Sequence, residues 1–342
     1  MRLEIAPRRL RLASPLATAH GTVGERELLD VLILGADGVA GAGEAAPLPS
    51  YDGVSLDEVR AALEDCRPIV HDAEGLPRAT VLAECRRAAV LPQAVAAIDL
   101  ALWDLEGRRA DVPVWRLLGG HPDPPPIAVN ALLHAEDRAG AAREAAAAAA
   151  AGFACVKAKV GIGDDAGRLA AIRAAVGDDV ALRIDANGAW EVEQAPAALR
   201  ALEPCRIECC EEPVHGVEAL RAVARSSPIP IAMDETAIAP GALESGATPI
   251  VCLKLSRCGG VSGLLEAAET VRAAGGEVYL ASTLDGPLGI AGALHAAAVL
   301  RPRRPCGLAT LAAFEGLELD PALAVERGFM RVPSGPGLGV RA

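Results

Sequence analysis

Five short apolar segments that end in charged residues follow one another through the middle of the chain: ACVKAK (154–159), ALRID (181–185), IECCE (207–211), PIAMD (230–234) and IVCLK (250–254). Helix-like stretches separate these segments, so strand and helix alternate. Three further apolar segments, at 127–132, 277–282 and 306–310, bring the number of predicted strands to eight. Eight strand-helix units predict a (β/α)8 barrel of the TIM type, in which the carboxyl ends of all strands meet at one face.

The segments on either side of the barrel predict further organisation. Residues 1–120 contain strand-like segments followed by helix-like ones, which is typical of an α+β domain. The sequence HPDPPP (121–126) cannot continue a helix and marks the start of a barrel domain at 121–312. Residues 313–342 contain no further strand-helix unit, and we expect them to pack back on the N-terminal domain. The predicted fold is an α/β barrel with an N-terminal α+β capping domain.

Lysine is rare in this chain, and its positions are informative. It occurs only at 157, 159 and 254, whereas the other thirty basic residues are arginine. A guanidinium stays protonated at any working pH, but burial and nearby charge can bring an ammonium pKa to about 7–8, so only lysine can act as a base. Alternate residues of a strand share a face, so Lys157 and Lys159 are expected to point into the barrel mouth together. We expect all three lysines to be catalytic rather than leftover surface residues.

Three successive strands end in carboxylates, Asp185, Glu211 and Asp234. Any one of them could be a helix N-cap, but that role does not explain three in a row with lysines on both sides. Like charges that converge raise one another's pKa, so such a cluster needs a cation. An all-oxygen site with open positions suits Mg²⁺, with Mn²⁺ as a substitute.

Several longer motifs resemble one known family: LALWDLEGRRADVPVWRLLGG (100–120), KAKVG (157–161), RIDANGAW (183–190), EEP (211–213), MDET (233–236) and LKLSRCGG (253–260). Together they resemble the muconate lactonizing enzyme subgroup of the enolase superfamily. The resemblance implies metal ligation by the three carboxylates and places Lys159 and Lys254 on opposite faces of the substrate, with Lys157 assisting Lys159. It also implies that Asn187 and Glu235 support the ligands from behind.

The resemblance implies a reaction class as well. It implies Mg²⁺-dependent removal of the proton alpha to a carboxylate, through an enediolate. The segments ASTLDGPLGIAGALHAAA (281–298) and CGLATLAAFE (306–315) are similar to o-succinylbenzoate synthases and the related N-acylamino acid racemases. Syn-dehydration to o-succinylbenzoate is therefore the leading expectation, and muconate-type cycloisomerisation and N-acylamino acid racemisation or epimerisation stay open. Dipeptide epimerases of this family carry Asp-x-Asp on the eighth strand, and 306–310 contains no carboxylate, which disfavours a free-amine dipeptide.

Substrate contacts are expected from two N-terminal loops, 18–25 and PLPSYDG (47–53), and from the seventh strand end. The predicted contacts are Tyr51, Ser282 and Asp285, the last standing where many relatives have glutamate. Within EEP, Glu212 replaces the glutamine that is usual in the family.

Composition excludes several other classes. A net charge of −12 and only three Phe, two Tyr and three Trp argue against a general nucleic-acid binder. No apolar run reaches the ~18 residues of a membrane helix, and the start lacks the pattern of a signal peptide, so we expect a cytoplasmic protein. We also expect it to be a homo-oligomer that acts on a small carboxylate. Two rival hypotheses are a phosphate-binding barrel isomerase, from the Gly-rich turn at 259–263, and a non-catalytic binding protein.

Overall fold

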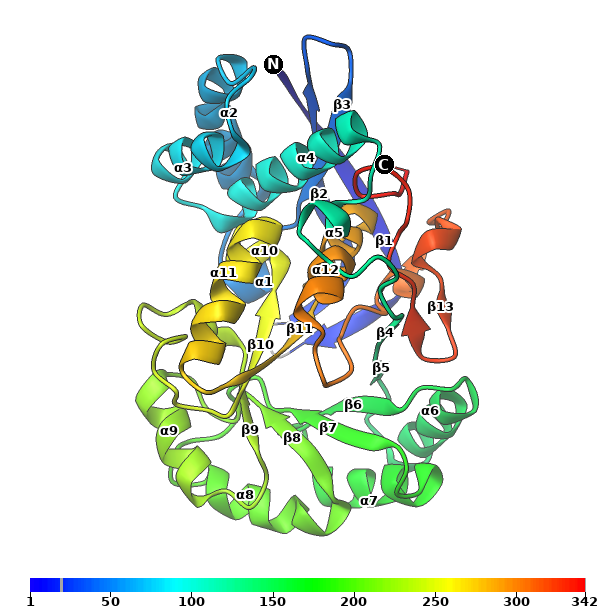
Figure 1. The fold of residues 1–342 in the computed structure, drawn as a ribbon. Helices are drawn as coiled ribbons and strands as arrows, with labels where there is room; N and C mark the ends of the chain where they lie inside the picture. Colours follow the sequence, from blue (N-terminus) through cyan, green and yellow to red (C-terminus); the bar gives the residue numbers. More distant parts are fainter. Residues whose placement is uncertain (19–20, 342) are drawn as a thin grey trace.

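A capping domain sits on one end of a barrel in the computed structural model, which describes residues 1–18 and 21–341 (Figure 1). The chain builds the capping domain first, then the barrel, and its C-terminal segment returns to the capping side. Both termini therefore lie at the same end of the molecule (Figure 1).

The capping domain combines an antiparallel sheet with helices. Its sheet contains β1 (Arg2–Thr18), β2 (Gly21–Leu34) and β3 (Ala40–Ala45), and its helices are α1 (Pro49–Asp52), α2 (Leu56–His71), α3 (Arg78–Ala88), α4 (Pro92–Ala110) and α5 (Val114–Leu117). Helix α2 starts at a capping box, in which the Ser55 hydroxyl accepts from the Glu58 N–H and the Glu58 carboxylate accepts from the Ser55 N–H at 2.8 Å. This α+β arrangement is as predicted.

Glycines in β3 let helix α4 approach the sheet closely. A Cβ atom on Gly41 would lie 2.1 Å from the carbonyl oxygen of Ala101, and one on Gly43 would lie 2.1 Å from that of Ala97. No larger residue fits at these two positions without moving the helix. The contact fixes the orientation of α4, whose Asp99 side chain then reaches Ser262 of the barrel.

The barrel alternates strand and helix as expected. Its elements are β4 (Ile127–Ala128), β5 (Ala131–Leu133), α6 (Arg138–Ala150), β6 (Cys155–Lys159), α7 (Asp165–Val176), β7 (Ala181–Asp185), α8 (Ala195–Leu202), η1 (Glu203–Cys205), β8 (Ile207–Glu211), α9 (Val217–Ser226), β9 (Ile231–Met233), η2 (Glu235–Ile238), β10 (Ile250–Lys254), α10 (Leu255–Cys258), α11 (Gly260–Ala273), β11 (Glu277–Ala281) and α12 (Pro287–Leu300). Seven strands form one parallel sheet in the order β11-β10-β9-β8-β7-β6-β5. The TIM-type fold class is confirmed.

The eighth strand differs from the prediction. Segment 306–310 forms no regular strand but closes the barrel through isolated bridges, Val129 with Cys306 and Ala281 with Gly307. The Gly307 N–H donates to the Leu280 carbonyl at 2.8 Å. The physical reason lies just before it, in RPRRP (301–305), because proline has no N–H to donate and restricts the backbone on both sides.

The C-terminal segment contacts both domains. It contains η3 (Leu311–Ala313), β12 (Phe314–Glu315), η4 (Pro321–Leu323), β13 (Val325–Glu326) and β14 (Phe329–Met330). Strand β12 pairs with β1 of the capping sheet, whereas β14 pairs with β4 of the barrel. The segment therefore joins the two domains on their outer side.

Apolar side chains form two buried clusters, one inside the barrel and its interface and one inside the capping domain.

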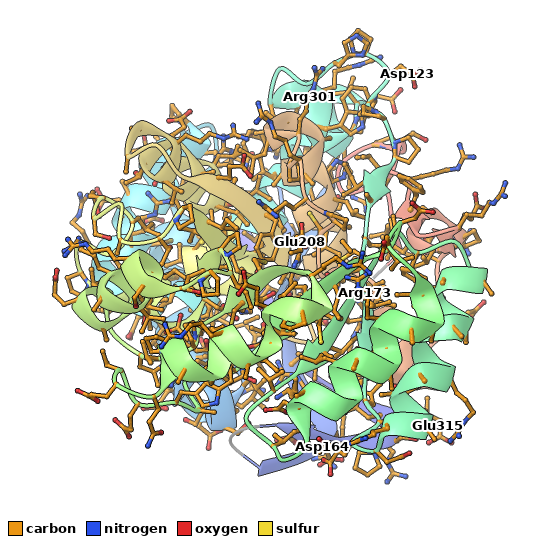
Figure 2. All side chains as sticks on the ribbon, turned by 90° about the horizontal axis from the view of Figure 1, so that it is seen from below. Asp123, Asp164, Arg173, Glu208, Arg301 and Glu315 are labelled. Carbon is orange, nitrogen blue, oxygen red and sulfur yellow. The ribbon has the colours of Figure 1, made fainter. Side chains whose placement is uncertain are left out.

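Seen from below, Glu208 lies near the middle of the view, whereas Asp164 lies toward its edge (Figure 2). The buried guanidinium of Arg183 donates to Glu208 at 3.1 Å, so a charged pair lies within the barrel away from its mouth. Among the described residues, no helix is long and apolar enough to cross a membrane.

Candidate active site

The charged residues predicted from the strand ends do meet at one face of the barrel. Lys159 is paired in register with Asp185 across β6 and β7, and Asp185 with Glu211 across β7 and β8. Asp234 directly follows β9, and Lys254 ends β10. Because the strands are parallel, their carboxyl ends bring these side chains together.

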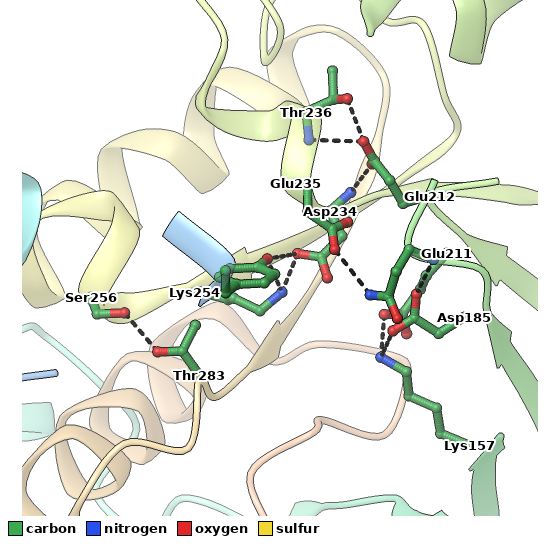
Figure 3. A network of polar contacts seen from close by, with 12 residues as sticks. Lys157, Asp185, Glu211, Glu212, Asp234, Glu235, Thr236, Lys254, Ser256 and Thr283 are labelled. Carbon is green, nitrogen blue, oxygen red and sulfur yellow. Dashed lines mark hydrogen bonds and ion pairs between the residues drawn. The ribbon is translucent and has the colours of Figure 1, made fainter. Parts of the chain in front are cut away.

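Lys157 lies between two carboxylates (Figure 3). Its Nζ is 2.8 Å from Asp185 Oδ2 and also donates to Glu211 Oε2. Burial alone would lower the pKa of Lys157, but the charges of Asp185 and Glu211 hold it well above its usual value. Lys157 is thus a fixed positive charge that aligns the two carboxylates.

Lys254 is held in the same way on the other side of the carboxylates (Figure 3). Its Nζ contacts Asp234 Oδ1 and lies 2.8 Å from the hydroxyl of Tyr51, which in turn donates to Asp234 Oδ1 at 3.1 Å. Burial opposes the charge of Lys254, but Asp234 raises its pKa well above the usual value. The capping domain therefore reaches the reactive centre through Tyr51.

Lys159 is different from its two neighbours. Within the described ranges it makes no ion pair or side-chain hydrogen bond, although it lines the same pocket as Lys157. Burial lowers the pKa of Lys159, and the positive charge of Lys157 adds to that effect against the opposing charge of Asp185. Two lysines only two residues apart are thus in opposite electrostatic environments.

The carboxylates fit a divalent cation. Glu211 is fully buried, and its Oε1 has no hydrogen-bond partner in the part of the chain that the structure describes. Ligand atoms of Glu211, Asp234 and Cys252 lie within 4.8 Å of one another, and Lys157 links Asp185 to Glu211. Burial raises the pKa of the Cys252 thiol well above its usual value, and a hard cation such as Mg²⁺ prefers the carboxylate oxygens to a thiol. Mg²⁺ binds oxygen ligands, and the buried Glu211 oxygen that lacks a hydrogen-bond partner is suited to be one of them.

Two further predicted residues lie behind the carboxylates. Asn187 donates its side-chain N–H to Glu235 Oε1 at 2.9 Å, and its backbone N–H donates to Asp185 Oδ1 at 3.0 Å. Burial, followed by the charge of Asp234, raises the pKa of Glu235 to about 8. The hydrogen bonds that Asn187 makes with Glu235 and Asp185 thus orient the Asp185 carboxylate.

Glu212 does not extend the ion site, although it lies within 4.8 Å of ligand atoms of His215 and Glu235. Its carboxylate accepts from the N–H groups of Asp234 at 2.8 Å and Thr236 at 3.0 Å, and from the Thr236 hydroxyl. These donors already satisfy its oxygens, so Glu212 anchors the turn that carries Asp234.

A pocket of about 160 Å³ opens beside this centre. Its walls are lined by Leu48, Ser50, Tyr51, Asn130, Leu132, Lys157, Lys159, Asp185, Asn187, Asp234, Lys254, Ala281, Ser282, Thr283, Leu284, Gly307, Ala309 and Thr310. Apart from the lysines and carboxylates at its base, every wall residue that the structure describes is neutral. Part of the predicted loop 18–25 lies outside the described residues.

Of the three predicted substrate contacts, Tyr51 and Ser282 line the pocket and Asp285 does not. Asp285 is 2% exposed, and its carboxylate accepts from the hydroxyl of Thr283 at 2.8 Å. The short side chain of Asp285 turns back into its own loop, so a substrate contact by Asp285 stays a prediction. Asn130, which the sequence did not single out, also lines the pocket and lies in the short gap between β4 and β5.

Comparison with known proteins agrees with this geometry. A family model described as "Enolase C-terminal domain-like" matches residues 140–342, and one described as "Mandelate racemase / muconate lactonizing enzyme, N-terminal domain" matches residues 1–119. The chain belongs to the mandelate racemase/muconate lactonizing enzyme group of the enolase superfamily. The hydrophobic dipeptide epimerase of Enterococcus faecalis is 31% identical over 93% of this chain and 92% of its own length.

Two further members of the superfamily are similar. The N-succinyl-L-Arg/Lys racemase of Bacillus cereus is 30% identical over 60% of this chain and 58% of its own length. A dipeptide epimerase from Cytophaga hutchinsonii, solved with Mg and the dipeptide D-Ala-L-Val, superposes with a TM-score of 0.90 at 28% identity and covers 98% of this chain and 94% of the other. These enolase-superfamily relatives are epimerases and racemases rather than o-succinylbenzoate synthases.

Proposed function

We propose that this protein is a metal-dependent racemase or epimerase that removes and returns the proton on the carbon next to a substrate carboxylate. The observation that carries the proposal is the placement of two lysines on either side of the carboxylates. Lys159 ends β6 and Lys254 ends β10, and the strands β7, β8 and β9 with their carboxylates lie between them. With a lysine on each side, one can remove a proton from one face of the α-carbon while the other delivers a proton to the opposite face.

The metal would be held by Asp185, Glu211 and Asp234, with Mg²⁺ as the expected ion and Mn²⁺ as an alternative. When bound, the ion would neutralise the negative charge that develops on the substrate carboxylate as the α-proton leaves. Lys157 keeps Asp185 and Glu211 aligned for that task, since it contacts both.

The lysines differ in how they hold a proton. Lys159 has no ion-pair partner among the described residues, so its amine is free to accept the α-proton from its side. Lys254 is held as an ammonium by Asp234 and Tyr51, so it is ready to donate a proton from the other side. In the reverse direction the two exchange these roles.

The substrate class follows from the neutral pocket walls. The free ammonium group of an amino acid or of a dipeptide's first residue needs a carboxylate beside it, because a buried unpaired charge is costly. The closing segment places Gly307, Ala309 and Thr310 on the pocket and none of these is charged. We therefore propose an amino acid whose α-nitrogen is acylated and uncharged. The Bacillus cereus relative, an N-succinyl-L-Arg/Lys racemase, supports this class, whereas the Enterococcus faecalis and Cytophaga hutchinsonii relatives are dipeptide epimerases.

The test is α-proton exchange followed by NMR in D₂O. N-acetyl and N-succinyl amino acids, free-amine dipeptides and the o-succinylbenzoate precursor are each incubated with the protein and Mg²⁺, with EDTA as the control. We expect EDTA-sensitive exchange and loss of optical purity for the N-acylated amino acids. Turnover of the o-succinylbenzoate precursor alone would instead establish the dehydratase, and exchange of no substrate would refute enzymatic function of this type.

A further inference from the structure

Two buried ionisable residues of the capping domain bind the barrel next to the pocket. Arg26 on β2 is 2% exposed, and Glu44 on β3 is 3% exposed. Neither lines the pocket, and neither takes part in the proton transfer proposed above. Burying charged side chains is costly unless they are well bonded, so their partners indicate what they hold in place.

Arg26 bonds backbone from both domains with a single guanidinium. Its Nη1 donates to the Pro47 carbonyl at 2.6 Å, and its Nη2 donates to the Ala46 carbonyl at 3.2 Å, just before helix α1. Its Nε donates to the carbonyl of Leu284 in the barrel loop after β11, at 3.3 Å. Leu284 has φ of 59°, a left-handed conformation that is uncommon for a non-glycine residue and persists only when its surroundings enforce it.

Glu44 caps a barrel helix from the other domain. Its Oε1 accepts from the N–H of Gly286 at 2.6 Å, and its Oε2 accepts from the N–H of Leu288 at 3.1 Å, at the start of α12. These N–H groups have no partner within the helix, so the Glu44 oxygens satisfy them, while burial and the nearby charge of Asp285 raise the pKa of Glu44 to about 8. A Cβ atom on Gly286 would lie 2.6 Å from Glu44 Oε2, and one on Gly289 would lie 2.7 Å from Oε1. Glycine at both positions makes room for the carboxylate.

The segments that these residues bind form two walls of the pocket. The segment after Pro47 supplies Leu48, Ser50 and Tyr51, and the loop before Gly286 supplies residues 282–284. We propose that Arg26 and Glu44 are positioning residues that hold these two walls in one fixed arrangement across the domain interface and thereby set which substrates fit. All of these contacts are made by the chain itself. The substrate identity, but not the positioning, rests on the function proposed above.

The molecule contains a matched control for this role. Asp99 on α4 is another fully buried carboxylate of the capping domain, and it also caps a barrel helix. It accepts from the N–H of Ser262 at 2.9 Å and from the Ser262 hydroxyl at 2.6 Å, in the first turn of α11. Neither Asp99 nor Ser262 lines the pocket. Loss of Asp99 should therefore weaken domain docking without changing the two walls.

The test compares Glu44→Gln and Arg26→Lys with Asp99→Asn. For each folded variant, kcat and KM of Mg²⁺-dependent α-proton exchange are measured with a preferred N-acylamino acid and with one that has a bulkier side chain. We expect KM for the preferred substrate to rise about tenfold and discrimination between the two to fall about tenfold in the first two variants, with kcat little changed. Asp99→Asn should lower Tm without either change. Wild-type KM and discrimination in both Glu44→Gln and Arg26→Lys would overturn the proposal.

Hydrogen exchange of the wild-type protein gives a second test that needs no variant to fold and no substrate to be identified. We expect strong protection, measured by mass spectrometry without substrate, for the amides of Gly286 and Leu288 and for those of the non-proline residues in the segment 46–54. Exchange of both segments at the rate of an unstructured loop would overturn the positioning role. A protein that shows this protection but exchanges no substrate α-proton would refute the proposed function and leave the positioning role standing.

Discussion

His295 makes folding stability depend on pH in a way that one substitution can isolate. The side chain is fully buried on α12, where its Nδ1 accepts from the N–H of Trp115 at 3.2 Å. Its other nitrogen, Nε2, therefore carries the proton and donates to the carbonyl of Leu338 at 3.1 Å. Protonation would place a second N–H against the N–H of Trp115. The neutral ring thus joins a barrel helix, a capping helix and the C-terminal segment.

The size of the effect follows from the pKa of His295. Burial lowers that pKa from 6.5 to about 4. The unfolded chain therefore binds a proton between these two pH values and the folded protein does not, so stability falls as pH decreases through this window. At about 1.4 kcal/mol for each tenfold change in the ionisation constant, the full loss is about 3 kcal/mol, of which about 2 kcal/mol is lost between pH 7 and pH 5.

The assay compares urea unfolding of the wild type and His295→Gln at pH 7 and pH 5. Glutamine also has one acceptor and one donor group but does not titrate, so carboxylate effects cancel in the comparison. We expect the wild type to lose about 2 kcal/mol more than the variant between the two pH values. Equal losses in both proteins would show that His295 is not held neutral, and the reasoning from burial would fail.

Four further predictions concern the site and the domain interface. Lys159→Ala and Lys254→Ala should each abolish inversion and reduce α-proton exchange of one enantiomer by about 10²–10⁴-fold, with exchange of the other enantiomer retained; NMR on separate enantiomers checks this, and inversion by either variant would contradict it. Glu211→Gln should weaken Mg²⁺ binding more than about tenfold in calorimetry, since its Oε1, which has no hydrogen-bond partner among the described residues, is a predicted ligand, and unchanged affinity would remove it from the ion site. Gly43→Ala should lower the free energy of unfolding by about 1–3 kcal/mol, because its Cβ would meet the backbone of α4 at 2.1 Å; denaturation measures it, and wild-type stability would mean that the helix moves freely. Thr310→Asp should shift kcat/KM toward free-amine dipeptides by supplying the missing carboxylate, and an unchanged preference would argue against ammonium charge as the discriminating feature.

Much of the barrel could be predicted because its signals are local. Strand length, alternation and spacing are properties of neighbouring residues, and parallel strands must bring their carboxyl ends together. Strand pattern and chain direction therefore predicted the lysines and carboxylates at the ends of five successive strands. The same reasoning failed at 306–310, where the prolines before Cys306 leave only isolated bridges, although the apolar run reads as a strand.

The same limit applies to individual side chains. Lys157 and Lys159 lie two residues apart on the same face of one predicted strand. Nevertheless, Lys157 bridges two carboxylates, whereas Lys159 has no ion pair within the described chain. Asp285 appears at a strand end like the other site residues, but its carboxylate bonds to Thr283 in its own loop. Which acid or base is free to react depends on atoms from several strands at once.

The sequence by itself therefore determined the barrel, the capping domain and the set of charged groups at the strand ends, since each follows from local pattern and chain direction. Only the tertiary structure decided the contacts across the domain interface. Tyr51 meets Lys254, and Glu44 meets Gly286, across 203 and 242 residues of sequence. Such contacts depend on how two separately patterned domains dock, and docking is set by complementary surfaces and buried hydrogen bonds that no stretch of neighbouring residues contains.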